Sequence, residues 1–242
     1  MRDSILERLA VAACGEHTAR VIEIGAGRGA LTRHLLPRTD ELHALELDSY
    51  LVSYLQRKFD GEAKLFIHEG DVLGTDLAQW GAAPIIGNLP YYITSPIIEK
   101  FINLDARFER AVFLMQWEVA ERLLAKPHSR DYGYLTVATG LVCEAELVLK
   151  APPSAFVPPP KIESGAVLLR RKAESPANRD RLLEFVRRCF TQKRKTLRNN
   201  LHAVYGDRID MLPQAQLRAE QLSIHQFVDL YEKVTGLYTE SS

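Results

Sequence analysis

The chain has 242 residues, of which 46% are hydrophobic and 26% are charged, so it can fold around a core and is not a disordered protein. No apolar run approaches the roughly 18 residues of a membrane span, and residues 1–13 have the pattern of an amphipathic helix, not of a signal peptide. We therefore expect a cytoplasmic protein. Three isolated cysteines, at positions 14, 143 and 189, form neither a disulfide framework nor a zinc motif and are expected to be buried free thiols.

The formal net charge is zero, but the charges are unevenly distributed. Residues 1–105 contain 10 Lys and Arg against 15 Asp and Glu, and residues 106–242 contain 21 against 16. Within residues 161–198 there are 12 basic and 4 acidic residues. A local basic surface on a neutral protein predicts binding to a polyanion in the second half of the chain.

Strand and helix patterns alternate through the first two thirds of the chain. Strands are predicted at residues 20–25, 42–46, 64–68, 84–87 and 110–116, with helices near 30–36, 50–59 and 117–125. This alternation predicts an α/β fold with a doubly wound, mostly parallel sheet. Two further strands, at 144–149 and 166–170, have no helix between them, so they are expected to pair antiparallel at one edge.

The end of the chain has a different pattern. Residues 174–178 are polar and are interpreted as a linker, and everything from Arg179 onward is helical in pattern, with breaks at Gly206, Pro213 and Gly236. We therefore predict two domains, a ligand-binding domain over residues 1–173 and a small all-helical domain over residues 179–242.

A glycine loop follows the first strand and predicts a cofactor site. Gly25 and Gly27 lie where backbone can approach a ligand closely, and Glu46 ends the second strand, where a carboxylate can accept hydrogen bonds from ribose hydroxyls. A nicotinamide dinucleotide would fit these features too. Its motif has Gly-x-Gly-x-x-Gly, whereas the third glycine here, Gly29, comes one place early.

The third strand ends in a second acidic position. Asp71, followed by Val72, can accept a hydrogen bond from an adenine amino group. Carboxylates at the ends of two successive strands, after a glycine loop and without a P-loop lysine, fit a nucleoside ligand that has no pyrophosphate.

The run Gly87-Asn88-Leu89-Pro90-Tyr91-Tyr92 closes the fourth strand and indicates chemistry on an adenine amine. The amine lone pair is delocalised into the ring, so accepting its hydrogens, by the Asn88 oxygen and a backbone carbonyl near Pro90, would localise that lone pair for methylation. Pro90 fixes the backbone, and Tyr91 offers a surface for a flipped base. Phe156, held between prolines, is the candidate for the second face of the base. A sulfonium donor needs no metal and no covalent nucleophile.

With these residues in place, the chain resembles the bacterial small-subunit rRNA adenine dimethyltransferases, the kasugamycin-sensitivity family, over nearly its whole length. The resemblance rests on the glycine loop and on residues 88–92, 153–164 and 192–201, the last being the most family-specific. It implies a class I S-adenosylmethionine methyltransferase fold and N6,N6-dimethylation of two adjacent adenosines near the 3′ end of 16S rRNA. It also implies that Gly25, Glu46, Asp71 and Asn88 contact the cofactor, and that Tyr91 and Phe156 enclose the adenine.

One feature departs from that family. Its members usually carry a Gly-Gln-Asn-Phe-Leu segment upstream of a helix like residues 3–13, where this chain begins. The segment contributes to the cofactor and substrate pocket in the family. We therefore expect this chain to bind S-adenosylmethionine more weakly than a version that carries the segment, and equal affinities in calorimetry would contradict this.

A basic helix is predicted from residue 182 to residue 201. At about 100° per residue, Val186, Phe190, Leu197 and Leu201 share one face, and a cationic stripe covers another, consisting of Arg187, Arg194 and Arg198 flanked by Arg188 and Lys195. Guanidinium groups in such a stripe suit a phosphate backbone. Lys193 falls toward the apolar side and is not expected to contact phosphate.

Other functions are compatible with parts of this pattern. A 23S rRNA adenine methyltransferase of the macrolide-resistance type shares the catalytic run, but the block at residues 192–201 disfavours it. A DNA adenine methyltransferase lacks the C-terminal region. A non-catalytic ribosome-assembly or transcription factor on the same fold is the alternative outside enzymes, and intact Asn88, Glu46 and Asp71 disfavour it. The expected partner is 16S rRNA in the 30S subunit or its precursor, bound by a monomer without metal or membrane.

Overall fold

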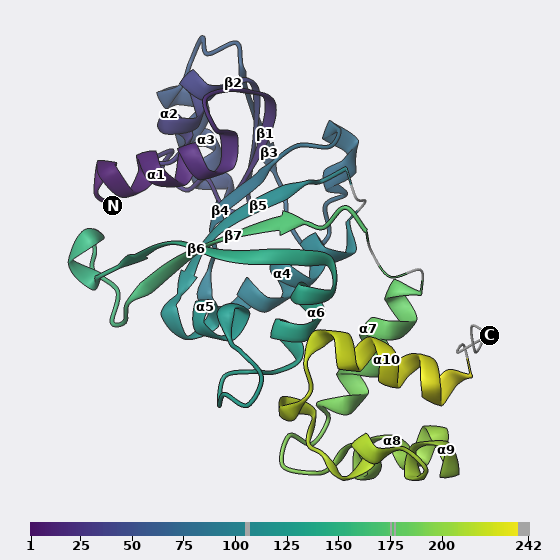
Figure 1. The fold of residues 1–242 in the computed structure, drawn as a ribbon. Helices are drawn as coiled ribbons and strands as arrows, with labels where there is room; N and C mark the ends of the chain where they lie inside the picture. The colour runs from purple at the N-terminus through teal and green to yellow at the C-terminus, as the bar shows by residue number, and fades with distance from the viewer. Residues whose placement is uncertain (105–106, 175, 177, 237–242) are drawn as a thin grey trace. The chain divides into compact units, whose positions relative to one another are not determined.

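The computed structural model describes residues 1–104, 107–174, 176 and 178–236. The chain forms two compact units, each built from two separate segments (Figure 1). The first unit comprises residues 1–120 and 143–171, and the second comprises residues 121–142 and the chain from residue 172 onward. Within the described ranges, every helix is too short or too polar to span a bilayer.

The first unit is built on one seven-stranded sheet. Its strands in chain order are β1 (Thr18–Ile24), β2 (Thr39–Glu46), β3 (Leu65–Glu69), β4 (Ile85–Asn88), β5 (Arg110–Gln116), β6 (Cys143–Ala151) and β7 (Ser164–Arg171). Their order across the sheet is β3-β2-β1-β4-β5-β7-β6. The first five run parallel, whereas β7 is antiparallel to β5 and to the edge strand β6. The predicted doubly wound, mostly parallel sheet with an antiparallel pair at one edge is confirmed.

Helices and 3₁₀ turns precede the first strand and follow most of the others. They are α1 (Asp3–Cys14), α2 (Thr32–Leu35) with the 3₁₀ turn η1 (Leu36–Arg38), α3 (Ser49–Lys58), η2 (Leu77–Trp80), η3 (Tyr91–Ile93), α4 (Thr94–Asn103) and η4 (Pro153–Ala155). A further helix, α5 (Trp117–Leu124), follows β5. The helix expected near residues 30–36 is shorter than predicted, because residues 27–31 form turns after the glycine loop.

The core of this unit explains the long apolar runs in its central strands. All five residues from Ala111 to Met115 in β5 are buried, as expected for a strand covered on both faces. Leu6, Leu9 and Ala13 of α1 pack into the same apolar cluster as Val112 of β5. All three cysteines are free and buried, as predicted.

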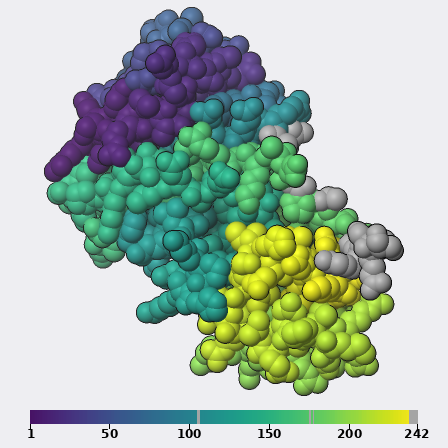
Figure 2. Space-filling model, in the orientation of Figure 1, coloured from purple at the N-terminus to yellow at the C-terminus, as the bar shows by residue number. Residues whose placement is uncertain are grey.

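The second unit is helical. It contains α6 (Tyr134–Val142), α7 (Arg179–Cys189), α8 (Leu197–Tyr205), α9 (Asp207–Asp210), η5 (Pro213–Gln216), η6 (Ala219–Gln221) and α10 (Ile224–Thr235). The atoms of the segments from α8 to α10, light green to yellow in Figure 2, pack together closely. The predicted breaks at Gly206 and Gly236 are helix ends, and Pro213 begins η5.

The continuous helix predicted from residue 182 to residue 201 is wrong. α7 ends at Cys189, residues 190–196 form a turn, and α8 starts at Leu197. The Asn200 side chain donates to the Cys189 carbonyl oxygen at 2.8 Å, and the Thr196 hydroxyl accepts from the Asn199 amide at 3.4 Å as an N-cap. Side-chain capping on both sides of the turn therefore separates the two helices.

The grouping of residues 121–142 differs from the predicted domain boundaries. This segment contains α6 and belongs to the second unit, where α6 contacts α7 and α10, whereas the sequence pattern assigned it to a domain over residues 1–173. The junction between Arg171 and Lys172 lies close to the predicted boundary. Ser175 and Ala177 of the predicted linker lie outside the described residues.

Candidate active site

The glycine loop lies directly after β1, at the edge of the sheet where the parallel strands end. Gly25 and Gly27 have φ angles of 69° and 58°, in the left-handed region that favours glycine. A Cβ atom at Gly29 would collide with the Phe59 ring, so the loop also needs a glycine there for packing. The sequence therefore forms a loop whose backbone is exposed to a ligand at the strand end.

Glu46 fastens this loop to the end of β2. Its side-chain Oε2 accepts a hydrogen bond from the Gly27 amide at 2.8 Å, and Oε1 accepts from the amides of Leu47 at 2.9 Å and Asp48 at 3.1 Å. The residue is only 8% exposed. The three amide donors fix the orientation of this carboxylate at the site.

Asp71 and Val72 follow β3 on the same edge. The Asp71 carboxylate accepts from the Leu73 amide at 2.9 Å, which closes an Asx-type turn and leaves the side chain exposed at the strand end. Val72 is buried. The two residues predicted to contact the adenosine part of a cofactor thus lie together, one polar and accessible, the other apolar.

A cavity of about 390 Å³ lies between these strand ends. Among the residues predicted to bind the cofactor or the base, Gly25, Glu46, Asp71, Val72 and Pro90 line it, whereas Gly27, Asn88, Tyr91 and Phe156 do not. The remaining lining residues were not singled out from the sequence and are Ile24, Leu45, Leu47, Asp48, Gly70, Tyr92 and Ile93. All of them are within a few positions of a strand end, which is the one signal in the sequence that could have identified them.

Asn88 is the last residue of β4 and is exposed. The preceding Gly87 is required for close packing, because a Cβ atom there would come within 2.7 Å of the Ile24 carbonyl oxygen. β4 can therefore lie tightly against β1, which places Asn88 beside the end of the strand that carries the glycine loop.

Pro90 and Tyr91 begin a tight turn after β4. The Pro90 carbonyl oxygen accepts from the Ile93 amide at 3.2 Å and from the Thr94 hydroxyl at 3.0 Å. This carbonyl is therefore already engaged by two donors of its own turn. Tyr91 is 42% exposed, so part of its ring is available to a ligand.

Phe156 reaches the same edge of the sheet by a different route. Because β7 is antiparallel to β5, its first residue, Ser164, pairs with Gln116 at the carboxyl end of β5. The loop that precedes β7, and carries Phe156, therefore starts and ends at the edge where Asn88 lies. Phe156 is half-buried and packs against the apolar cluster that also contains Ala155.

A buried carboxyl that the sequence did not single out lies beneath the glycine loop. Glu23 of β1 is 1% exposed, and its Oε2 accepts from the Thr32 hydroxyl at 2.7 Å. Burial raises the pKa of Glu23 to about 7, and the nearby charge of Glu46 adds to the rise. The sequence around Glu23 shows only the pattern of a strand, and that pattern did not indicate that the Glu23 side chain is buried.

In the second unit the predicted cationic residues differ in their surroundings. The Arg187 guanidinium lies 4.3 Å from the centroid of the Tyr134 ring and donates to its hydroxyl at 2.8 Å. Arg188 pairs with Glu184 at 3.0 Å. Arg198 donates twice to the carboxylate of Asp210, at 2.9 and 3.0 Å, which raises the pKa of Arg198 and lowers that of Asp210. The single guanidinium stripe expected from a continuous helix is therefore not formed.

Arg194 and Lys195 lie in the turn between α7 and α8 and are exposed, with no ion pair to any residue that the structure describes. Their neighbour Lys193 donates to the Arg130 carbonyl oxygen and lies 3.7 Å from a Glu220 carboxylate oxygen. Lys193 thus holds the turn against the loop at residues 126–131.

Within the described ranges, no group of three or more His, Cys, Asp or Glu side chains could hold a metal ion. The candidate site therefore consists of a nucleoside-sized cavity, a polar Asn-Leu-Pro-Tyr turn beside it and an aromatic loop on the same edge of the sheet.

Comparison with known proteins identifies the family. The family model for ribosomal RNA adenine dimethylase matches residues 1–235. The curated protein "Ribosomal RNA small subunit methyltransferase A" of Nitrosomonas europaea is 41% identical over 221 residues, covering 89% of this chain and 85% of that protein. Its namesake in Acidobacterium capsulatum is 40% identical over 240 residues, covering 93% and 84%.

Solved structures agree with this assignment. A dimethyladenosine transferase from Plasmodium falciparum has a TM-score of 0.84 at 28% identity, with 96% of both chains covered. The 23S rRNA methyltransferase ErmE has a TM-score of 0.71 at 28% identity, with 96% of this chain and 97% of the other covered. The chain belongs to the ribosomal RNA adenine dimethylase family of S-adenosylmethionine-dependent methyltransferases.

Proposed function

We propose that this protein transfers methyl groups from S-adenosylmethionine to N6 of two adjacent adenosines near the 3′ end of 16S rRNA, in the 30S subunit or its precursor. The observation that carries the proposal is the meeting of the cofactor cavity and the Asn88–Tyr91 turn at one edge of the sheet. The curated relatives, which are named for the small ribosomal subunit, favour this substrate over 23S rRNA.

The residues present fit S-adenosylmethionine. A cavity of about 390 Å³ is in the size range of small-molecule sites. Three amides hold the Glu46 carboxylate in place, and a carboxylate offers about four acceptor positions, so one position is free for a ribose hydroxyl. The Asp71 carboxylate would accept a hydrogen bond from the adenine amine, and Val72 would lie against the adenine ring. Gly25 and Gly27 would allow the backbone to approach the methionine part of the cofactor. When bound, the cofactor supplies an activated sulfonium methyl group.

Asn88 would prepare the target amine. Its side-chain oxygen would accept one N6 hydrogen, and the amine needs a second acceptor to localise its lone pair. Because the Pro90 carbonyl is engaged by Ile93 and Thr94, we assign the second acceptor to the Leu89 carbonyl. The N6 lone pair would take the methyl group that bound S-adenosylmethionine supplies, and the displaced amine proton would pass to solvent. Tyr91 and Phe156 would stack on the two faces of the flipped base.

The turn between α7 and α8 is the part of the second unit best suited to rRNA phosphates. We propose that Arg194 and Lys195 contact the backbone directly, together with Lys126 and Arg130 of the loop that Lys193 holds beside them. Arg187, Arg188 and Arg198 would contribute less, because each already has a partner within the protein.

Methyl transfer to purified particles tests this function. Radiolabelled methyl groups should enter unmethylated 30S particles and not 50S particles, and digestion should release N6,N6-dimethyladenosine. Asn88→Ala should lower kcat by at least about 100-fold, because the amine loses the acceptor that aligns it. The matched control is Gln79→Ala, which removes an exposed amide from η2 and should leave the rate unchanged.

Each alternative gives a different result. Label in 50S particles would favour the 23S enzyme. An absence of label from the wild-type protein, with 30S binding retained, would favour a non-catalytic assembly factor.

A further inference from the structure

Helix α1 lies between two segments that serve different parts of the proposed site. Its buried residues Leu6, Leu9, Ala10 and Ala13 pack into the apolar core of the first unit. At about 100° per residue, Asp3 and Glu7 then share one flank of the helix, and Ile5 and Arg8 lie toward the other. The two flanks of α1 make different contacts.

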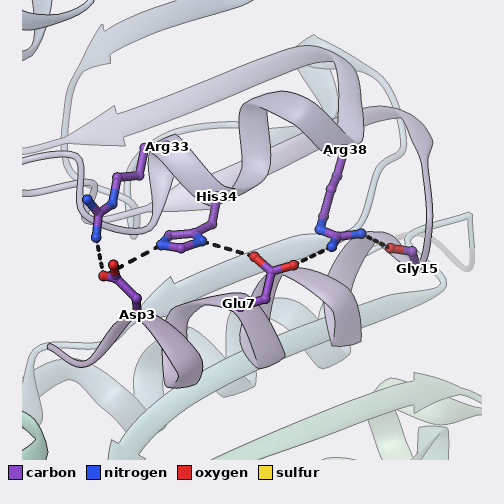
Figure 3. A network of polar contacts seen from close by, with 6 residues as sticks. All are labelled: Asp3, Glu7, Gly15, Arg33, His34 and Arg38. Carbon is purple, nitrogen blue, oxygen red and sulfur yellow. Dashed lines mark hydrogen bonds and ion pairs between the residues drawn. The ribbon is translucent and has the colours of Figure 1, made fainter.

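The acidic flank is bound to the segment that follows the glycine loop (Figure 3). Asp3 pairs with Arg33, and Glu7 pairs with Arg38. His34 lies between the two carboxylates, with its Nδ1 3.0 Å from a Glu7 oxygen and its Nε2 4.0 Å from an Asp3 oxygen. Arg38 also donates to the Gly15 carbonyl oxygen at 3.1 Å, just after the end of α1. Hydrogen bonds from Arg38 and His34 lower the pKa of Glu7, so it is ionised at neutral pH.

The segment at residues 31–38 is itself connected to the cofactor site. Thr32 donates its hydroxyl to the buried Glu23 beneath the glycine loop. Leu31 and Leu35 belong to the same apolar cluster as the buried face of α1. The acidic flank of α1 therefore contacts the structure that supports Gly25 and Gly27.

The other flank is bound to the strand and loop that carry Phe156. The Arg2 amide, immediately before α1, donates to the Ala155 carbonyl oxygen at 2.8 Å, one residue before Phe156. The Arg8 guanidinium donates to the Val148 carbonyl oxygen in β6 at 2.6 Å. Ile5 and Phe156 both pack against the same apolar cluster.

We propose that Asp3 and Glu7 are positioning residues for methyl transfer, which act through α1 to hold the Phe156 loop in register with the glycine loop. The inference rests on the proposed function, in which the cofactor lies at one loop and the adenine at the other. In-line transfer depends on the separation and alignment of the two reactants, and a displacement of about 1 Å far from the reacting atoms can cost about 100-fold in rate. A helix bound to both loops fixes that separation.

Glu7→Gln is the primary test, because the side chain is 46% exposed and the substitution preserves its shape. With the cofactor residues intact, kcat should fall about tenfold while KM for S-adenosylmethionine changes by less than about twofold. Backbone amides of residues 154–157 should exchange with solvent faster. In a double-mutant cycle, adding Arg38→Gln should lower kcat little further, because the two residues act as one pair.

Glu41→Gln is the matched control. Glu41 is 41% exposed and accepts from Arg20 Nε at 2.6 Å, so it also belongs to a half-exposed ion pair of the first unit, but it contacts neither loop. Unchanged amide exchange over residues 154–157 in Glu7→Gln, or an equal loss of kcat in Glu41→Gln, would overturn the proposal. If the wild-type protein transferred no methyl groups, the proposed function would fail, and the exchange measurement alone would decide on the positioning role.

Discussion

Glu23 links the folded state of the cofactor site to pH. Its carboxyl is buried beneath the glycine loop and has one hydrogen-bond donor, Thr32, so burial raises its pKa to about 7 from an ordinary value near 4.5. The folded state therefore binds more protons than the unfolded state between these two values. The stability that Glu23 contributes is complete below about pH 4.5 and is lost as the pH rises through 7.

Glu23→Gln should remove this dependence. From pH 5 to pH 8, the free energy of unfolding of the variant minus that of the wild type should rise by at most about 3 kcal/mol. The reason is that the amide of the variant carries no buried charge at pH 8. Urea unfolding followed by the fluorescence of Trp80 and Trp117, both in the first unit, measures the change.

The exposed carboxyl of Glu69, at the end of β3, provides the control for this measurement. Glu69→Gln should show the same stability relative to the wild type at both pH values. An equal difference for Glu23→Gln at pH 5 and pH 8 would contradict an elevated pKa at Glu23.

The sequence predicted the positions of several site residues because strand ends are visible in it. Gly25, Glu46, Asp71 and Asn88 each follow or end an apolar run, and the ends of parallel strands meet at one edge of a sheet. The three amide donors to Glu46 could not be predicted, since they depend on loop conformations. The burial of the Glu23 side chain could not be predicted either, because it depends on the segment that packs above it.

At the scale of elements, the division between α7 and α8 shows where local propensity misleads. Residues 190–196 contain no glycine or proline, and their apolar spacing continues that of α7, so the sequence favours one helix. The helix ends because Asn200, eleven residues further on, donates to the Cys189 carbonyl, and because Leu197 donates its amide to the Leu217 carbonyl oxygen. Both partners are distant in sequence and invisible to a periodicity argument.

This division changes which cations should matter for RNA. Replacing Arg194 and Lys195 together by glutamine should weaken rRNA binding and reduce the slope of log K against log salt by about 1.4 to 1.8, as expected for two lost phosphate contacts. Arg198→Gln should change that slope by less, because its guanidinium is bound to Asp210. Fluorescence anisotropy with an rRNA fragment at several salt concentrations would measure both.

Arg198→Gln also serves as the matched single-charge control for Arg194→Gln. Equal slopes for these two single variants would contradict the assignment of phosphate contacts to the turn between α7 and α8. Affinity for S-adenosylmethionine should remain that of the wild type in all three variants.

At the scale of the whole molecule, charge is divided between the two units. The segments of the first unit contain 16 Lys and Arg against 20 Asp and Glu, and those of the second contain 15 against 11. The sequence predicted an uneven distribution of charge and a mostly parallel sheet with an antiparallel pair at one edge, but not the order of the strands. It did not predict that residues 121–142 join the second unit, because no helix was predicted over residues 134–142 and an apolar segment gives no sign of which core it enters.

The division of charge predicts two different responses to salt. Raising the salt concentration from 50 to 200 mM should weaken rRNA binding by at least about tenfold and should change S-adenosylmethionine affinity by less than about twofold. Anisotropy with rRNA and calorimetry with the cofactor, in the same buffers, test this. An equal loss of both affinities would contradict the prediction that salt weakens rRNA binding much more than cofactor binding.

The construction of the second unit from two segments affects the protein while it is being made. α6 is complete at Val142, but of the two helices it packs against, α7 ends at Cys189 and α10 only at Thr235. At about 5–20 residues per second, α6 leaves the ribosome roughly 5–20 s before α10 is complete. During that interval the apolar residues Val137, Ala138 and Leu141 have no finished core to enter, although all three are buried in the folded protein. A nascent chain of this enzyme therefore presents a helix for chaperone capture until translation is nearly complete.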